Sequence, residues 1–209
     1  MKPNNLWILG DSFSEGFTST NKWAQDYVDW KGYIPKSFGD IICEEFGYNQ
    51  KNLAVGGSDN YTIFESLCKH IKVINKDDVV IIGWSDIRRF RIVNYERWLP
   101  LNFGMKKELN FSGINFSYDT FAETIVNRDN QLFADEVNNW IHLLNHLCKF
   151  KIIHWTPFEW KIDGLNYLKK FSPIAEETNF ELEDYHYSEK GHQDLAKQLI
   201  NIINKNNII

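Results

Sequence analysis

The chain has 209 residues, which is enough for one domain with a full hydrophobic core. Hydrophobic residues make up 43% and charged residues 24%, as in ordinary globular proteins. The net charge of −5 argues against a general nucleic-acid binder, and no apolar run reaches the roughly 18 residues that a membrane-spanning helix needs.

Segments with strand character alternate with segments of helical spacing along most of the chain. In chain order we expect a strand over Leu6–Leu9, a helix over Ser37–Phe46, a strand over Lys51–Val55, a helix over Tyr61–Ile74, a strand over Val79–Ile82, a helix over Asn130–Phe150, a strand over Lys151–Trp155 and a helix over Ser188–Ile203. This alternation predicts a mainly parallel sheet with helices on its faces.

Residues 90–129 interrupt the alternation with weak periodicity and many aromatic side chains, Trp98 among them. A segment this long without a clear pattern is usually an insertion or a lid rather than a core element. Because no linker or internal repeat is present, we expect a single domain over residues 1–209, with an insertion or lid at about 90–129.

The N-terminal residues lead directly into an apolar strand, so we expect no signal peptide. The three cysteines, Cys43, Cys68 and Cys148, are widely spaced in apolar helical contexts, and we interpret them as buried free thiols in a reducing compartment. We therefore expect a protein that is cytoplasmic when synthesised.

Side chains suited to nucleophilic catalysis stand at the two ends of the chain. Ser12 follows the first expected strand, and the last loop carries His186 after two acids, Glu183 and Asp184. A serine hydroxyl attacks an acyl carbon only when a histidine takes its proton, and an acid orients that histidine. Because loops at the carboxyl edge of a parallel sheet share one crevice, we expect these groups to meet there. Taken on its own, Ser12 is better explained as the N-cap of the following helix, and the other groups shift the preference to a nucleophile.

Three ordered blocks resemble those of the GDSL-type, or SGNH, serine hydrolases, an esterase and lipase family with single-domain bacterial and phage members. The blocks are Gly10-Asp11-Ser12, then Asn52 with Gly56-Gly57, and finally Asp184, His186 and Gly191-His192. The resemblance implies a three-layer α/β/α sandwich of the flavodoxin-like kind, with a mainly parallel sheet of about five strands. It also implies that Ser12 is the nucleophile, His186 the general base, and the N–H groups of Ser12 and Gly57 an oxyanion hole. No metal or organic cofactor is implied.

Two positions depart from the family's pattern. Where the family has Gly-x-Asn-Asp, this chain has Gly83-Trp84-Ser85-Asp86, so Ser85 is a shorter candidate for the third oxyanion donor. Loss of one such donor typically costs about 10²–10³ in rate. The family's acid stands three residues before the histidine, which is Glu183, whereas Asp184 stands two before. Both stay candidates, with a slight preference for Asp184.

Arg88, Trp84 and Trp98 are candidates for substrate contacts. Arg88, Arg89 and Arg91 form a cluster that either recognises an anionic group or is a solvated, salt-bridged surface. Aromatic faces in the 90–129 segment suit a sugar ring, and they equally suit a lipid chain or the packing of the insertion itself.

We expect a serine-dependent ester hydrolase that removes a small acyl group, an O-acetyl group on a carbohydrate by preference. The expected partner is a small-molecule or carbohydrate ester and not a nucleic acid, and the oligomeric state stays open. The alternatives are a catalytically weak or inactive binding or structural module on the same fold, and an O-acyltransferase.

Overall fold

The structure is a computed structural model that describes residues 4–17, 22–87, 89–94, 97–101, 109–111, 114–116, 130–168, 171–206 and 208, with the backbone alone between 90 and 116. Its centre is one five-stranded sheet in the order β2-β1-β3-β8-β9, and every pairing in it is parallel. The strands are β1 (Asn5–Leu9), β2 (Asn49–Asn52), β3 (Val79–Gly83), β8 (Lys151–Thr156) and β9 (Asn166–Tyr167). The predicted parallel sheet of about five strands is confirmed.

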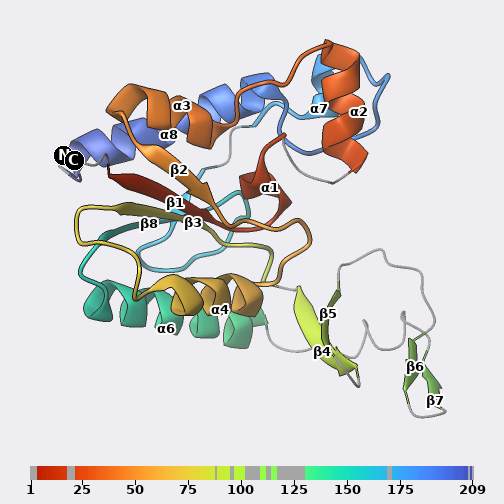
Figure 1. Cartoon of the computed structure of the whole chain (residues 1–209). Helices are drawn as coiled ribbons and strands as arrows, with labels where there is room; N and C mark the ends of the chain where they lie inside the picture. Colours follow the sequence, from red (N-terminus) through yellow and green to blue (C-terminus); the bar gives the residue numbers. More distant parts are fainter. Residues whose placement is uncertain are drawn as a thin grey trace.

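Helices cover both faces of this sheet, which gives the three layers (Figure 1). One face carries α3 (Phe38–Phe46) and α8 (Glu189–Lys205), and the other carries α4 (Asn60–His70) and α6 (Asn130–Leu147). Successive side chains of the buried strand β1 point to opposite faces of the sheet, so β1 contributes to the core on both sides. Leu6 and Ile8 belong to the core under α3 and α8, whereas Trp7 and Leu9 belong to the core under α4 and α6.

The ends of the helices follow their capping residues. Ser37 caps α3 in a reciprocal capping box with Asp40, and Gly47 ends that helix in the left-handed conformation. Ser188 caps α8 through a hydrogen bond from the N–H of Gly191. Two predicted helices are shorter than expected, since α4 ends at His70 and α6 at Leu147.

Several short elements escaped the sequence analysis. They are α1 (Ser12–Glu15), α2 (Lys22–Lys31), α7 (Ile174–Glu177) and strand β9, while β2 begins two residues earlier than expected. Figure 1 shows α2 and α7 side by side near the carboxyl edge of the sheet. Helix α2 buries only Ala24 and Tyr27, so its apolar stripe is narrow.

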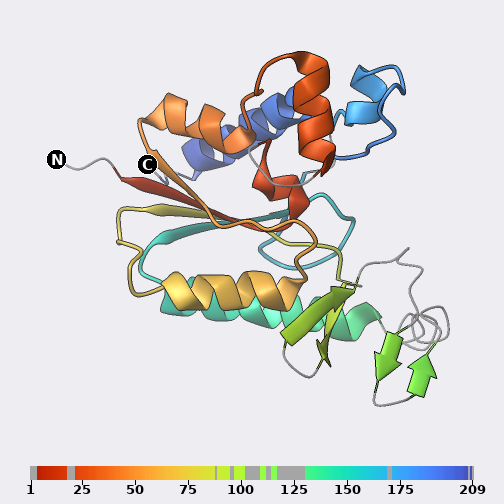
Figure 2. The ribbon, with the colours of Figure 1, turned by 45° about the vertical axis from the view of Figure 1, so that its right-hand side comes forward.

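Between the third and fourth strands of the sheet, in chain order, the structure describes two antiparallel hairpins. These are β4 (Phe90–Asn94) with β5 (Arg97–Leu101), and β6 (Leu109–Phe111) with β7 (Ile114–Phe116). Both are separate from the five-stranded sheet, and Figure 2 shows them outside the three layers. That this segment is an insertion or lid stays a prediction.

Within the described residues, no helix has the length and apolar character required to cross a bilayer. The three cysteines are free. Cys43 and Cys148 are half-buried, but Cys68 is exposed on α4, so the expectation of three buried thiols is wrong for Cys68.

Candidate active site

The turn after β1 presents Ser12 at the carboxyl edge of the sheet. Gly10 is required there, because a Cβ at this position would collide with Ser14 and approach the carbonyl oxygen of Gly83. The N-cap of α1 is Asp11, whose Oδ1 accepts the N–H of Phe13 at 3.0 Å. Ser12 is therefore the first residue of the helix and not its cap, which leaves its hydroxyl available for another partner.

That partner is His186. Its Nε2 lies 2.8 Å from Ser12 Oγ, and its Nδ1 lies 2.8 Å from Asp184 Oδ1. A carboxylate only accepts hydrogen bonds, so Asp184 fixes the proton on Nδ1 and leaves Nε2 to accept the proton of Ser12. The backbone N–H of His186 also donates to Asp184 Oδ1 at 2.8 Å. Burial raises the pKa of Asp184, but the two hydrogen bonds from His186 outweigh it and the net direction is downward.

Glu183, the other candidate acid, is exposed. It lines a shallow hollow together with Lys22, Trp23, Asp26, Glu181, Leu182 and Asp184. Of the two neighbouring acids, Asp184 is therefore the one that contacts His186.

Aromatic rings enclose His186, and the sequence analysis missed them. Trp23 of α2 stacks on the imidazole with ring centroids 4.2 Å apart and planes at 9°. Phe13 of α1 packs against the same ring with centroids 5.4 Å apart. Trp23, Tyr27 and Trp30 stand at i, i+4 and i+7, which is a helical signal that pointed to α2.

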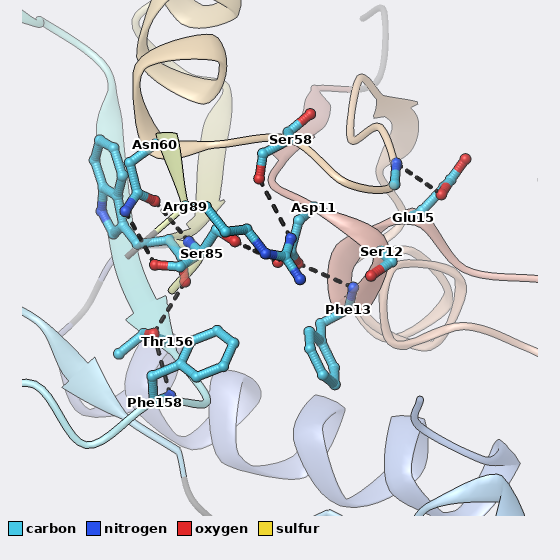
Figure 3. A network of polar contacts seen from close by, with 12 residues as sticks. Asp11, Ser12, Phe13, Glu15, Ser58, Asn60, Ser85, Arg89, Thr156 and Phe158 are labelled. Atoms are coloured by element: carbon cyan, nitrogen blue, oxygen red, sulfur yellow. Dashed lines mark hydrogen bonds and ion pairs between the residues drawn. The ribbon is translucent and has the colours of Figure 1, made fainter. Parts of the chain in front are cut away.

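The second block is tied to α1 by side-chain hydrogen bonds. Asn52 Nδ2 donates to the carbonyl oxygens of Ser14 and Glu15, at 3.1 and 3.0 Å. The N–H of Gly56 donates to Glu15 Oε2 at 2.9 Å (Figure 3). Gly57 follows with a φ of +80°, a conformation that favours glycine. These contacts hold the Gly57 loop against the helix that begins at Ser12.

Ser85 is buried, and its hydroxyl points to Asp11. Ser85 Oγ donates to Asp11 Oδ2 at 2.7 Å, while Ser85 N donates to Asn60 Oδ1 at 2.7 Å (Figure 3). Asn60 Nδ2 in turn donates to the carbonyl oxygen of Ser85 at 3.0 Å. Since the single hydroxyl proton of Ser85 has a carboxylate partner, this geometry counts against Ser85 as an oxyanion donor.

Arg89 completes the network around Asp11. Its Nη1 lies 2.8 Å from Asp11 Oδ2 and 3.4 Å from the carbonyl oxygen of Ser58, and Figure 3 shows the guanidinium between these two loops. One member of the predicted arginine cluster is thus paired with a carboxylate of the chain itself. Arg88 lies outside the described residues, as does the side chain of Trp98.

Trp84 is part of the core, which corrects the expectation that it contacts substrate. It is 2% exposed, stacks on Trp140 of α6, and donates from Nε1 to His154 Nδ1 at 3.1 Å. Burial lowers the pKa of His154 to about 4, so this imidazole is a neutral acceptor.

Among the described residues, no group of three or more His, Cys, Asp or Glu side chains is arranged to hold a metal ion. The serine, imidazole and carboxylate form one line of hydrogen bonds, as acyl transfer by a serine requires.

No protein-family model and no curated protein matches the chain. Among solved structures it is similar to an acetyl xylan esterase, Est2A, from the rumen bacterium Butyrivibrio proteoclasticus, with a TM-score of 0.51 and 13% sequence identity. This similarity covers 99% of the chain but 65% of the esterase, so the chain spans less than two thirds of its neighbour's length. A second carbohydrate esterase gives a TM-score of 0.46 at 14% identity, over 98% of this chain and 69% of that one. At 13% identity the first similarity shows the fold alone: the chain shares the α/β fold of this esterase, and its central sheet has five parallel strands.

Proposed function

We propose that the protein is a serine-dependent ester hydrolase. The observation that carries this proposal is the line of two 2.8 Å contacts from Ser12 Oγ through His186 to Asp184. The order of the three groups matches that of a nucleophile, a base and an orienting acid.

In the proposed reaction, Ser12 Oγ attacks the acyl carbon while its proton passes to His186 Nε2. The C–O bond to the leaving alcohol then breaks, and His186 returns the proton to the alcohol oxygen, which leaves an acyl-enzyme. Water attacks the acyl-enzyme as His186 takes a water proton, and that proton goes to Ser12 Oγ when the free acid departs. Asp184 stabilises the imidazolium in both steps.

The N–H groups of Ser12 and Gly57 are the proposed oxyanion donors. Ser12 N belongs to the first turn of α1, where backbone N–H groups lack an acceptor within the helix. The hydrogen bonds from Asn52 and Gly56 to Glu15 tie the Gly57 loop to α1, which supports the proposal because oxyanion donors must be held in fixed positions.

For the substrate, we propose a small acyl ester, with O-acetyl groups on a carbohydrate as the first class to examine. The solved structure of similar fold is an acetyl xylan esterase, which makes this class the first one to test. An O-acyltransferase would use the same first step and replace water by an alcohol in the second.

One observation favours a second candidate, a binding module with weak turnover. Ser85 stands where the family has an oxyanion asparagine, and its hydroxyl is bonded to Asp11. With two backbone donors only, the rate is expected to be lower by about 10²–10³ than with three.

The test is hydrolysis of p-nitrophenyl acetate and release of acetate from acetylated xylan, by the wild type, Ser12→Ala and His186→Ala. We expect turnover by the wild type alone, with unchanged circular dichroism in the variants. Binding of acetylated xylan without release of acetate would favour the binding module. Transfer of the acetyl group to an added sugar would favour the acyltransferase.

A further inference from the structure

The proposed mechanism gives no task to the indole that lies flat against its base. Trp23 stacks on the His186 imidazole at 4.2 Å with nearly parallel planes. Phe13 contacts the same imidazole from a tilted orientation at 5.4 Å, and Phe17 meets Trp23 edge-on at 6.3 Å. Trp23 is half-buried. The indole thus covers one face of the ring that joins Asp184 to Ser12.

The helix that carries Trp23 is anchored to two other elements. Lys31 Nζ lies 2.6 Å from Glu177 Oε1 of α7 and 2.9 Å from Glu189 Oε2 of α8. The hydroxyl of Tyr27 accepts the N–H of Glu189 at 3.0 Å. These contacts fix α2 against the part of the chain that also supplies His186, which keeps Trp23 close to the imidazole.

The face of an indole is negative, and it attracts a cation more strongly than a neutral ring. His186 becomes a cation only when it has taken the proton of Ser12. An interaction that is stronger in that state than in the resting enzyme lowers the barrier. On this basis, and resting on the proposed function, we propose that Trp23 is a positioning residue. Its indole holds the His186 ring in line with Asp184 and Ser12 and stabilises the imidazolium that forms during the reaction.

Other titratable groups lie around the same imidazole. In the described chain, Asp184 contacts it, and Lys22 and Asp26 of α2 line the hollow beside Asp184 with Glu181 and Glu183. Asp11, paired with Arg89, precedes Ser12, and His192 lies on α8. Burial, with a smaller effect from His186, lowers the pKa of His192 to about 3, so His192 is neutral near pH 7. Replacing Trp23 by an apolar residue changes none of these charges, which isolates the contribution of the ring.

The test is a ¹⁵N imidazole NMR titration of the free protein, with the His186 signals assigned by their loss in His186→Gln. A stacking interaction of the usual strength predicts that the pKa of His186 falls by about 0.5 in Trp23→Leu. Trp23→Phe keeps an aromatic face with a weaker quadrupole, so we expect a smaller fall. Trp30→Leu is the matched control, because it removes a tryptophan from the same helix that does not stack on His186. It also removes the exposed hydrogen bond from Trp30 Nε1 to Glu181 Oε2 but changes no charge, and we expect an unchanged pKa of His186.

An unchanged or raised pKa of His186 in Trp23→Leu overturns the proposal, since burial by the indole would then equal or exceed its attraction for the cation. An equal fall of the His186 pKa in Trp30→Leu also overturns the proposal, because the fall would then come from a change in the position of α2 and not from the loss of the stacked ring. If Trp23→Leu does not fold, Trp23→Phe against Trp30→Phe makes the same comparison. This readout needs no turnover, so it can fail while ester hydrolysis is observed, or succeed while hydrolysis is absent.

Discussion

At the scale of single residues, two neighbouring acids in the last loop differ in whether they contact His186. Asp184 and Glu183 are adjacent, yet Asp184 Oδ1 receives both the ring and the backbone N–H of His186, while Glu183 is exposed. Adjacent residues in an extended segment point to opposite sides, so one acid faces the imidazole and the other faces solvent.

Asp184→Asn should therefore damage the reaction far more than Glu183→Gln. An amide at position 184 can donate to Nδ1, which favours the wrong tautomer and leaves the imidazolium without a counter-charge. We expect kcat/KM for p-nitrophenyl acetate to fall by about 10²–10⁴-fold in Asp184→Asn and to change less than about threefold in Glu183→Gln. Equal effects of the two substitutions would contradict the assignment of the acid.

The Ser85→Ala variant distinguishes between two roles of Ser85, a structural partner of Asp11 and an oxyanion donor. The variant removes the 2.7 Å hydrogen bond to the buried carboxylate of Asp11, and Arg89 and the N–H of Phe13 remain as partners of that carboxylate. We expect a stability loss of about 1–3 kcal/mol in urea unfolding, with a rate change below about tenfold. A rate loss of about 10²–10³ with normal stability would make Ser85 an oxyanion donor after all.

Sequence order predicted the placing of Ser12 and His186, because strand ends of a parallel sheet converge on one edge. The choice between the two acids stayed open, since spacing alone does not say which side a loop residue faces. Trp84 was misassigned for a related reason. An aromatic residue after a buried strand can turn outward or into the core, and here His154 and Trp140 hold it inside.

At the scale of elements, α2 is the least expected helix and the one that brings Trp23 to the site. Only two of its residues are fully buried, although Trp23, Tyr27 and Val28 pack in a small apolar cluster with Phe17 and Ile174. Polar contacts therefore add to a limited apolar interface in holding α2 in place. Hydrogen bonds with Glu177 and Glu189 raise the pKa of Lys31 against the opposing effect of burial, so Lys31 remains charged.

Lys31→Met should loosen α2. It removes the cation that lies between Glu177 and Glu189 and leaves two carboxylates close together. We expect about 1–3 kcal/mol lower stability and faster hydrogen exchange in residues 22–31, measured by mass spectrometry. Lys36→Met is the matched control, because its ion pair with Glu44 is exposed and contributes little. Equal rates of hydrogen exchange in residues 22–31 of the wild type and Lys31→Met would show that other contacts hold the helix in place.

The sequence predicts best those helices that have both an apolar face at helical spacing and recognisable capping residues. Helix α3 has Ser37 at its start, Gly47 at its end and a clear apolar face, and its predicted bounds are nearly those observed. Strand β9 has two residues and pairs only with the end of β8, which is too short for any periodicity. Helices α1 and α7, of four residues each, were missed for the same reason.

At the scale of the whole molecule, two buried histidines set the response to acid. Burial lowers the pKa of His154 to about 4 and, together with the nearby His186, that of His192 to about 3. His192 Nδ1 accepts the N–H of Phe38 at 3.3 Å, and His154 Nδ1 accepts from Trp84, so both rings are held in the neutral form.

The free energy of unfolding should therefore fall as the pH drops from about 6.5 towards 4. Below the ordinary histidine pKa of about 6.5, these two histidines are protonated in the unfolded chain but stay neutral in the folded chain. Each of them then lowers the free energy of unfolding by up to about 1.4 kcal/mol per pH unit. Urea unfolding at pH 7, 6 and 5 measures this slope, and His154→Gln should remove about half of it. A flat profile between pH 6.5 and 5 would mean that these rings take up protons within the fold.

The measurement that tests the central claim most directly is covalent labelling with a fluorophosphonate, located by peptide mass spectrometry. It needs no knowledge of the natural ester, because it reports an activated serine. The account predicts a single adduct on Ser12 in the wild type, none at that peptide in Ser12→Ala, and labelling at least about 10²-fold slower in Asp184→Asn. A folded wild-type protein that takes no label at Ser12, or takes it equally fast without Asp184, would contradict the assignment of Ser12, His186 and Asp184 as a catalytic unit.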